Sequence, residues 1–467
     1  MTKRNGYDLA VIGAGSAAFA AAIRATSLGG RVALIERGTI GGTCVNVGCI
    51  PSKHLLAASH VYRKAGDHPF EGVETRRAGV SVQKLIAKKS VVVDELRDEK
   101  YVDLAAHYGF EIIRGHARFS GPQRLDVDGR EIEAAHIVIG TGSAPWVPSI
   151  EGLEEAGFLT STTAMELSDL PESLVVIGGN YIGLELGQVF ASLGSKVTIV
   201  EALDRVAPLE EPEISEAMTE ILEGQGIQVA TSAKVTRVEP GPPKTVVVKT
   251  NGGELRLTAA EILVATGRRP VLDGLDLDKA GVELDDRGGL VLDETLRTTN
   301  PNVLAAGDVT GAPQFVYVAA AQGTLAATNA LTPAGRKMDY TALPRVTFTT
   351  PNIAAVGLTD QQAVAAGYKC ECRVVELRHV PRARVNLDTR GLFKIVADAP
   401  TGKILGVHVL ADNAGDVIIA GVYAVKLGMT VGDVAETWAP YLTMAEGMKL
   451  TAQSFTTEVD MLSCCAA

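Results

Sequence analysis

The chain contains two copies of a strand, glycine-rich turn, helix, strand pattern, and this repeat constrains the fold more than any other feature. The first copy reads YDLAVIGAGSAAFAAAIRATSLGGRVALIERG and carries Gly13, Gly15 and Ala18 in G-x-G-x-x-A spacing. In such a unit, the glycines permit a tight turn and a close approach to a pyrophosphate, and the small third residue lets helix and strand pack closely. Glu36 ends the second strand, where an acidic residue accepts hydrogen bonds from a ribose. The first copy therefore predicts a dinucleotide-binding βαβ unit.

The second copy is less regular. It reads LVVIGGNYIGLELGQVFASLGSKVTIVEALDR over residues 174–205, with Gly178 and Gly183 at the first and third glycine positions. Asn180 occupies the second position, where it tolerates an unusual backbone angle but adds a side chain close to the expected cofactor. We expect a second dinucleotide site here. The alternative for both copies is an ordinary turn between strand and helix.

Three further segments end strands with residues typical of cofactor sites. HIVIGTGSAPWVP contains Thr141 and Gly142, and EILVATGRRP contains Gly267. LAAGDVTG places Asp308 after a short strand, where a carboxylate can bind a ribityl hydroxyl. The first cofactor domain is therefore expected to be interrupted by the second and to resume near residue 270.

The pattern changes near residue 340 to segments that read as antiparallel strands, followed by helical segments. The sequence predicts an α/β fold with two Rossmann-like domains and a C-terminal α+β domain. The predicted boundaries are residues 1–150 and 271–335 for the first domain, 151–270 for the second and 340–467 for the third.

Composition excludes several classes of protein. The net charge of −11 leaves no basic field for nucleic acid. No apolar run reaches the ~20 residues that a membrane helix needs, and the N-terminal MTKRNGYD leads into a strand without the apolar core of a signal peptide. We expect a cytoplasmic protein without a membrane span.

The six cysteines occur as three close pairs, which in a reducing compartment favours redox or metal chemistry over structural disulfides. Cys44 and Cys49 lie in GGTCVNVGCIPSK, where a helix N-terminus favours a thiolate. A disulfide that closes so short a loop contributes only about 2 kcal/mol, so it should be easy to reduce. The pair therefore favours an electron relay, with a static staple as the alternative.

These motifs together resemble the flavin disulfide reductases, which include glutathione reductase, dihydrolipoamide dehydrogenase, thioredoxin reductase and mercuric reductase. The resemblance covers nearly the whole chain and implies FAD on the first domain, NADPH or NADH on the second, and a homodimer formed by the C-terminal interface domain. It implies that Cys49 is the thiolate next to the flavin and that Cys44 is the thiol facing the substrate. It places Lys53 and Glu185 in an ion pair beside the flavin. Around FAD it places Gly38, Thr43, Ala117, Thr141 and Asp308.

The C-terminal part departs from the members that reduce a disulfide. Those members carry a histidine in an H-P-x-x-x-E run, whereas this chain reads APYLTMAEGM, with Tyr441 in the histidine position and Glu446 in the acidic one. A phenol with a pKa of about 10 is a poor acid-base group at neutral pH, where imidazole titrates at about 6.5. A disulfide substrate is therefore disfavoured.

The tail SFTTEVDMLSCCAA ends with adjacent Cys464 and Cys465. A short polar terminus is expected to be mobile, and two thiolates on it suit a soft metal ion. They also suit a disulfide relay, since some thioredoxin reductases end in a similar tail, but those enzymes keep the histidine that is missing here.

The combination of inner pair, tyrosine and tail most closely resembles the mercuric reductases, in a form without their N-terminal metal-binding domain. The resemblance implies that the tail thiols of one subunit bind Hg(II) and pass it to the inner pair of the other, where it is reduced to Hg(0). The metal-binding residues would be Cys44, Cys49, Cys464 and Cys465. Tyr101 matches a tyrosine near this metal, with Tyr441 opposite. Without the resemblance, Tyr101 reads as a packing residue on an amphipathic helix.

Three questions stay open at this level. Glu201 at the end of its strand favours NADH, whereas Arg205 could neutralise the 2′-phosphate of NADPH. Cys370 and Cys372 alternate along a predicted strand and read as ordinary strand residues or as a metal site. The alternative functions are a thiol-disulfide reductase and a thiol-rich protein that sequesters Hg(II) without reducing it.

Overall fold

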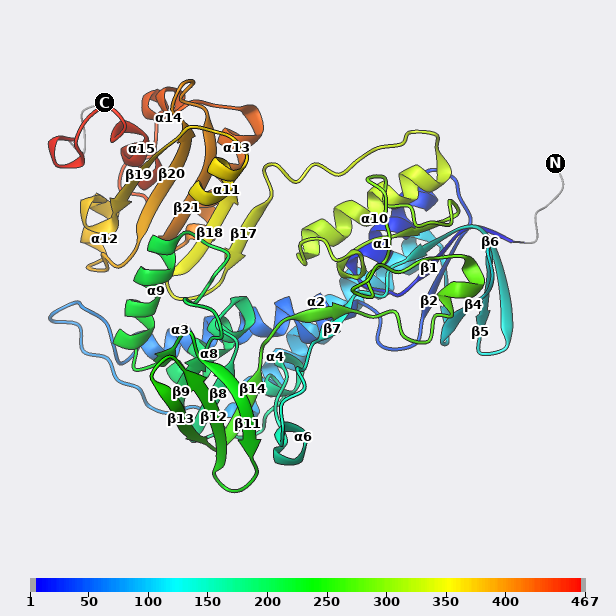
Figure 1. Cartoon of the computed structure of the whole chain (residues 1–467), viewed down its shortest axis with the longest axis horizontal. Coiled ribbons are helices and arrows are strands. Elements are labelled where there is room, and N and C mark those ends of the chain that lie inside the picture. The colour runs from blue at the N-terminus through cyan, green and yellow to red at the C-terminus, as the bar shows by residue number, and fades with distance from the viewer. Residues whose placement is uncertain (1–5, 463–467) are drawn as a thin grey trace. The chain divides into compact units, whose positions relative to one another are not determined.

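The computed structural model describes residues 6–462. The chain forms two compact units, which are described one at a time. The first unit comprises residues 1–54, 84–147 and 267–338, and the second comprises residues 55–83, 148–266 and 339–467. Figure 1 labels the elements along the chain.

The first unit is built on a mostly parallel sheet with the order β3-β2-β1-β6-β5-β4, in which β16 also pairs with β6. Its strands are β1 (Tyr7–Ile12), β2 (Val32–Glu36), β3 (Glu111–Arg114), β4 (Ala117–Gly121), β5 (Arg124–Val127), β6 (Arg130–Ile139) and β16 (Val303–Ala305). The central strands are apolar along nearly their whole length, as expected for parallel strands that are buried on both faces.

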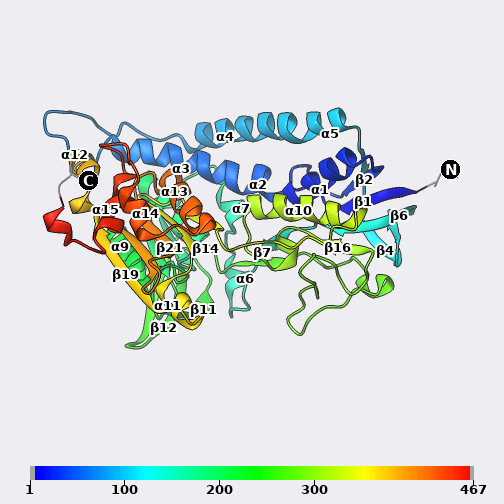
Figure 2. The same cartoon turned by 90° about the horizontal axis from the view of Figure 1, so that it is seen from above.

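Two helices of the first unit pack unusually closely. Helix α1 (Ser16–Ser27) lies along α10 (Val316–Leu331) in both views (Figures 1 and 2). A Cβ atom at Gly323 would lie 2.0 Å from the carbonyl oxygen of Ala17, so only glycine fits there. The alanine-rich sequence of α1 is therefore explained by its buried contact with α10 and the sheet.

The other elements that begin or end in the first unit carry the predicted residues Cys44, Cys49, Lys53, Tyr101 and Asp308. The helical elements are α2 (Gly42–Val47), α3 (Cys49–Lys64), α4 (Val82–Arg97), a π-helical turn (Asp98–Val102), α5 (Asp103–Tyr108) and a short 3-10 turn (Asp308–Thr310). Strands β7 (Ser143–Pro145) and β15 (Arg268–Pro270) form a small antiparallel pair.

The second unit contains a parallel sheet with the order β10-β9-β8-β14 and a three-stranded antiparallel sheet, β11-β12-β13. The strands are β8 (Ser173–Ile177), β9 (Lys196–Val200), β10 (Gln228–Ala230), β11 (Lys234–Glu239), β12 (Lys244–Thr250), β13 (Gly253–Ala259) and β14 (Glu261–Val264). The helices are α6 (Leu153–Ala156), α7 (Ser161–Ala164), α8 (Tyr181–Leu193) and α9 (Pro212–Gly224).

The C-terminal part of the second unit is an antiparallel sheet with the order β17-β18-β21-β20-β19. Its strands are β17 (Pro344–Thr347), β18 (Asn352–Gly357), β19 (Cys370–Glu376), β20 (Leu392–Asp398) and β21 (Ile404–Ala411). The helices are α11 (Asp360–Ala365), α12 (Pro381–Val385), α13 (Ala414–Leu427), α14 (Val431–Glu436) and α15 (Glu446–Gln453). The predicted fold class, two Rossmann-like α/β parts and a C-terminal α+β part, is confirmed. In residues 6–462, no helix combines the length and apolar character needed to cross a bilayer.

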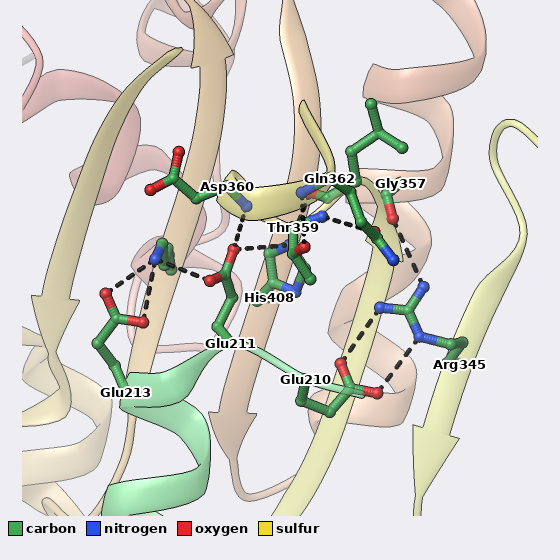
Figure 3. Close-up of polar contacts among 11 residues, drawn as sticks. Glu210, Glu211, Glu213, Arg345, Gly357, Thr359, Asp360, Gln362 and His408 are labelled. Atoms are coloured by element: carbon green, nitrogen blue, oxygen red, sulfur yellow. Dashed lines mark hydrogen bonds and ion pairs between the residues drawn. The ribbon is translucent and has the colours of Figure 1, made fainter. Parts of the chain in front are cut away.

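A buried network of charges stabilises the second unit (Figure 3). The Glu211 carboxylate accepts hydrogen bonds from Lys394 Nζ at 3.0 Å and from the backbone amide of Asp360 at 2.7 Å. The same ammonium group also contacts Glu213 at 2.8 Å. Side-chain exposure is only 4% for Lys394 and 2% for Glu211. The start of α9 is thus joined to β20 by charged side chains that interact with one another instead of with water.

We predict that Lys394→Met lowers the free energy of unfolding by about 3–5 kcal/mol, because it leaves the Glu211 carboxylate buried without its cation. Thermal and urea unfolding of the FAD-loaded protein measure this change. Lys426→Met is the matched control, since Lys426 and its partner Asp339 are both more than half exposed and such pairs contribute about 0–1 kcal/mol. Equal stability of the two variants would contradict the importance of the buried pair.

Candidate active site around Cys44 and Cys49

Cys44 and Cys49 approach each other across the junction of two helices. Cys44 lies in α2, and Cys49 is the first residue of α3. Both are half-buried, and no disulfide joins them, so the structure presents the dithiol form of the pair. The hydrogen bond with Cys49 and then burial raise the pKa of Cys44, while the charge of Lys53 acts in the opposite direction. Cys44 is therefore protonated at neutral pH.

The pair is held against the first glycine turn. The amide of Gly41 donates to the carbonyl of Ala14 at 2.8 Å, and a Cβ atom at Gly42 would lie 2.6 Å from the Cα of Gly15. Asn46 Nδ2 donates to the carbonyls of Ile40 and Gly42, each at 2.9 Å, and so ties α2 to the residues that precede it. Because the two backbones touch, the segment with the cysteines has a fixed position relative to the start of α1.

Tyr101 lies beside this pair. It belongs to the π-helical turn, a type of distortion that is common at functional sites. Its hydroxyl lies 3.2 Å from Ser16 Oγ, and its ring packs edge-on against Phe19 with 4.8 Å between centroids. Burial raises the pKa of Tyr101, and the charges of Cys44 and Cys49 raise it further. The tyrosine is thus a packing residue and a neighbour of both sulfurs at once.

A second polar group near Cys49 was missed in the sequence. Arg268 Nε donates to Ser143 Oγ at 2.8 Å, and that hydroxyl donates to Asp308 Oδ2 at 2.7 Å. Burial lowers the pKa of Arg268, whereas the charges of Asp308 and Cys49 raise it. The only available signal was the position of Arg268 directly after Gly267 in ATGRRP.

The first glycine turn fits a dinucleotide. Gly13 has φ of 111°, and a Cβ atom there would lie 2.4 Å from the Gly140 carbonyl oxygen, so this turn requires glycine. Gly15 caps α1, and its missing side chain leaves the first amides of the helix open to a phosphate. Ala18 is fully buried against the sheet. Glu36 Oε1 accepts a hydrogen bond from the Gly38 amide at 2.6 Å, which fixes the loop that follows β2.

The other predicted FAD residues have mixed environments. Thr141 Oγ1 donates to the Val271 carbonyl at 2.7 Å, and the Gly142 carbonyl accepts from the Val271 amide at 3.0 Å. Thr43 is exposed on α2, whereas Ala117 is 5% exposed at the start of β4. Thr141 and Gly142 therefore join the end of β6 to the residue after β15.

The second glycine turn has the same contact at its first position. A Cβ atom at Gly178 would lie 2.4 Å from the Ala265 carbonyl oxygen, and one at Gly183 would lie 1.9 Å from the Gly178 carbonyl oxygen. Asn180 caps α8, but its Oδ1 atom is buried without a hydrogen-bond partner among the residues that the structure describes. An unsatisfied acceptor beside a helix N-terminus fits a site that a bound nucleotide completes.

The segment directly after β9 holds the two residues expected to select the nicotinamide. Both carboxylate oxygens of Glu201 accept backbone hydrogen bonds, from Gly179 at 2.7 Å and from Leu203 at 2.8 Å. Arg205 contacts Asp204 at 3.4 Å, while its Nε atom is buried without a partner within residues 6–462. Glu201 is therefore anchored, and Arg205 retains an unused donor.

The remaining site residues lie in the second unit or outside the described residues. The Tyr441 side chain is half exposed, and Glu446 is buried and accepts from the Leu442 amide at 3.0 Å. Burial raises the pKa of Glu446, and the backbone hydrogen bonds lower it. Glu185 accepts from the Phe348 amide at 2.9 Å, and it belongs to a different unit from Lys53. Cys464 and Cys465 lie outside the described residues.

Comparison with known proteins gives a family for this arrangement. Residues 7–323 match the pyridine nucleotide-disulphide oxidoreductases, and residues 343–452 match the dimerisation domain of the same proteins. The chain belongs to this family. It is therefore an FAD-dependent NAD(P)H oxidoreductase, and its dimerisation domain makes it a homodimer.

The relatives include several mercuric reductases. The chain is 52% identical to the mercuric reductase of Streptomyces lividans over all of both chains. It is 50% identical to that of Bacillus cereus, over 98% of this chain and 73% of the relative. Among solved structures, the Cu(II) complex of the HOCl-induced flavoprotein disulfide reductase RclA from Escherichia coli is 31% identical, with a TM-score of 0.86 over 97% of this chain and 100% of RclA.

We predict that Cys49→Ala speeds the alkylation of Cys44 by iodoacetamide, because it removes the hydrogen bond that contributes most to the raised pKa of Cys44. Each unit of pKa recovered increases the thiolate fraction at neutral pH about tenfold. Peptide mass spectrometry over a pH series measures the rate. Cys49→Ser keeps a hydrogen-bonding side chain, so its alkylation rate should lie between those of the unaltered protein and of Cys49→Ala. Identical rates in all three proteins would show that burial alone sets the pKa of Cys44.

Proposed function

We propose that the chain reduces Hg(II) to Hg(0) with electrons from NAD(P)H. The observation that carries this proposal is the contact of Cys44 and Cys49 with each other beside Tyr101, in a chain that has Tyr441 where disulfide-reducing relatives have histidine. Two neighbouring thiols can hold a soft ion as well as form a disulfide. The chain is 52% identical to a mercuric reductase over its full length, which supports Hg(II) as the substrate.

The inner pair binds the ion by ligand exchange. Hg(II) arrives with two thiolate ligands, Cys44 and Cys49 replace them one after the other, and each proton that leaves a cysteine passes to the thiolate it displaces. Bound FAD supplies the two electrons, taken from NAD(P)H, that convert Hg(II) to Hg(0). The two sulfurs are then free to accept protons again. Lys53 keeps a positive charge beside the thiolates, and its ion pair with Glu185 stays a prediction.

A tyrosine at position 441 suits the reduction of Hg(II), whereas a histidine suits the reduction of a disulfide. Reduction of a disulfide needs a proton for the departing sulfur, whereas Hg(0) leaves without one. We place Tyr101 and the Tyr441 of the partner copy on opposite sides of the ion, with Glu446 buried behind the segment that carries Tyr441. The tail cysteines, Cys464 and Cys465, would deliver the ion from one subunit to the other.

The binding sites for the cofactors follow from the two glycine turns, which lie in the proposed FAD domain (residues 1–150 and 271–335) and NAD(P)H domain (151–270). Residues 340–467 would form the interface. For FAD we propose Gly13, Gly15, Ala18, Glu36, Gly38, Thr43, Lys53, Ala117, Thr141, Gly142 and Asp308, with Arg268 and Ser143 orienting Asp308. For the nicotinamide we propose Gly178, Gly183, Glu201, Arg205 and Gly267.

We predict that the purified yellow protein oxidises NAD(P)H when Hg(II) is added with excess small thiol, and that volatile Hg(0) is released. Oxidised glutathione, lipoamide and thioredoxin should cause no oxidation, because Tyr441 cannot protonate a leaving thiolate at neutral pH. Cys44→Ser is the control that should abolish the reaction. A response to a disulfide would favour a thiol-disulfide reductase, and stoichiometric binding without oxidation would favour a sequestering protein.

We predict that both coenzymes support turnover and that NADH is at least competitive with NADPH, because the anchored Glu201 carboxylate repels a 2′-phosphate. The ratio of kcat/KM for the two coenzymes measures this preference. Arg205→Ala should lower kcat/KM for NADPH and leave that for NADH nearly unchanged. A preference of about a hundredfold for NADPH in the unaltered protein would contradict the role given to Glu201.

A further inference from the structure

A second pair of thiols lies on the edge strand of the C-terminal sheet. Cys370 and Cys372 occupy alternate positions of β19, so both side chains are on the same face of the strand. Both are half-buried free thiols. They pack against a small cluster of apolar side chains that includes Val396 and Leu405. The two thiols thus share one face of β19 and are partly open to solvent.

Both thiols face the same carboxylate. Burial raises the pKa of Cys370, and the charge of Asp360 and a hydrogen bond with its side chain raise it further. The same causes raise the pKa of Cys372 to about 12, against an opposing effect of Lys394. The charge of Asp360 therefore acts on both thiols of the pair.

Asp360 has a fixed position. Asp360 is the first residue of α11, and its backbone amide donates a hydrogen bond to the Glu211 carboxylate. The side-chain carboxylate of Asp360 points away from that of Glu211 (Figure 3). The Glu211 carboxylate is in turn neutralised by Lys394. The carboxylate that acts on the thiol pair therefore belongs to a residue whose backbone is bonded to a buried ion pair.

We propose that Cys370 and Cys372 form a second binding site, for a soft thiophilic cation that is satisfied by two sulfur ligands, with Hg(II) as the cation most relevant to this chain. In residues 6–462, no group of three or more His, Cys, Asp or Glu side chains is arranged to hold a metal. An ion such as Zn²⁺, which takes four ligands, is therefore not expected there. Two-coordinate Hg(II) needs only the pair.

Binding is an exchange that needs no oxidant or reductant. An Hg(II) ion that carries two small thiolates forms two new bonds to Sγ of Cys370 and Cys372, and the two small thiolates leave with the two protons of the cysteines. The second bond forms within one molecule, so the pair holds the ion about 10²–10⁴-fold more tightly than a single thiol. Since the unoccupied pair is protonated, it is a poor target for alkylating agents, which react with thiolates.

The proposed site on β19 has a different role from the inner pair, Cys44 and Cys49. Cys44 and Cys49 belong to the unit that carries the first dinucleotide turn, whereas β19 belongs to the dimerisation domain. We expect an ion on β19 to be stored and exchanged with small thiols, and not reduced in place. Binding there requires no electron transfer, so the inference is independent of the proposed reductase activity.

The test measures binding in a protein that cannot turn over. The FAD-loaded dimer carrying Cys44→Ser, Cys49→Ser, Cys464→Ser and Cys465→Ser is mixed with Hg(II) as its bis-glutathione complex and then desalted in glutathione. We expect about one Hg per chain by elemental analysis, together with the loss of two titratable thiols and an X-ray absorption spectrum with two sulfur neighbours. Retention of no Hg by this background would overturn the proposal.

A matched variant tests the geometry of the pair. Adding Glu371→Cys and Cys372→Ser to the same background keeps two cysteines but places them on opposite faces of β19. It should retain at least tenfold less Hg in glutathione, and equal retention would show that the pair is not a chelating site.

Turnover provides a separate readout. Cys370→Ser with Cys372→Ser in the otherwise unaltered protein should leave the rate of Hg(II)-dependent NAD(P)H oxidation unchanged. Loss of that rate would show that the two thiols act in the reaction and would overturn their assignment as a storage site. If the unaltered protein showed no such oxidation, the proposed function would fail while the binding result on β19 stood.

Discussion

The close contact between the first glycine turn and α2 is the constraint on which the candidate site depends. Gly15 and Gly42 meet with no room for a side chain, and the Gly41 amide is bonded to the turn itself. The same turn leaves the amides of α1 open to a pyrophosphate. A single backbone contact thus sets the position of the cysteines relative to the cofactor-binding helix, and a redox pair needs that precision because electron transfer and ligand exchange both depend on short distances.

Much of this arrangement was predictable because its causes are local in sequence. Gly13, Gly15 and Ala18 occupy neighbouring turns of one βαβ unit, and Cys44 and Cys49 are separated by less than two helical turns. The alternation of Cys370 and Cys372 likewise required only the periodicity of a strand. Such patterns are set by backbone geometry, so they can be read before the fold is known.

The parts that were not predictable depend on contacts between distant segments. Ser143 and Asp308 are 165 residues apart, and Arg268 joins them only because β15 pairs with β7. Lys394 and Glu211, which pair in the buried network of charges, are 183 residues apart in the sequence. In the sequence these residues look like ordinary surface charges, which is the usual place for lysine and glutamate. Only the tertiary structure shows that they are buried and paired.

The two described thiol pairs, Cys44 with Cys49 and Cys370 with Cys372, have the same side chains but different charged groups around them. The hydrogen bond with Cys49 and burial raise the pKa of Cys44 against the opposing charge of Lys53, whereas burial and the charge of Asp360 raise the pKa of both Cys370 and Cys372. A cation beside a thiol favours the thiolate, which attacks a metal complex, and a carboxylate beside a thiol favours the protonated form. The cysteines whose pKa is raised are therefore held mainly as thiols, and the two pairs differ in the charged group that acts on them, Lys53 for Cys44 and Asp360 for Cys370 and Cys372, which suits the first pair to turnover and the second to storage.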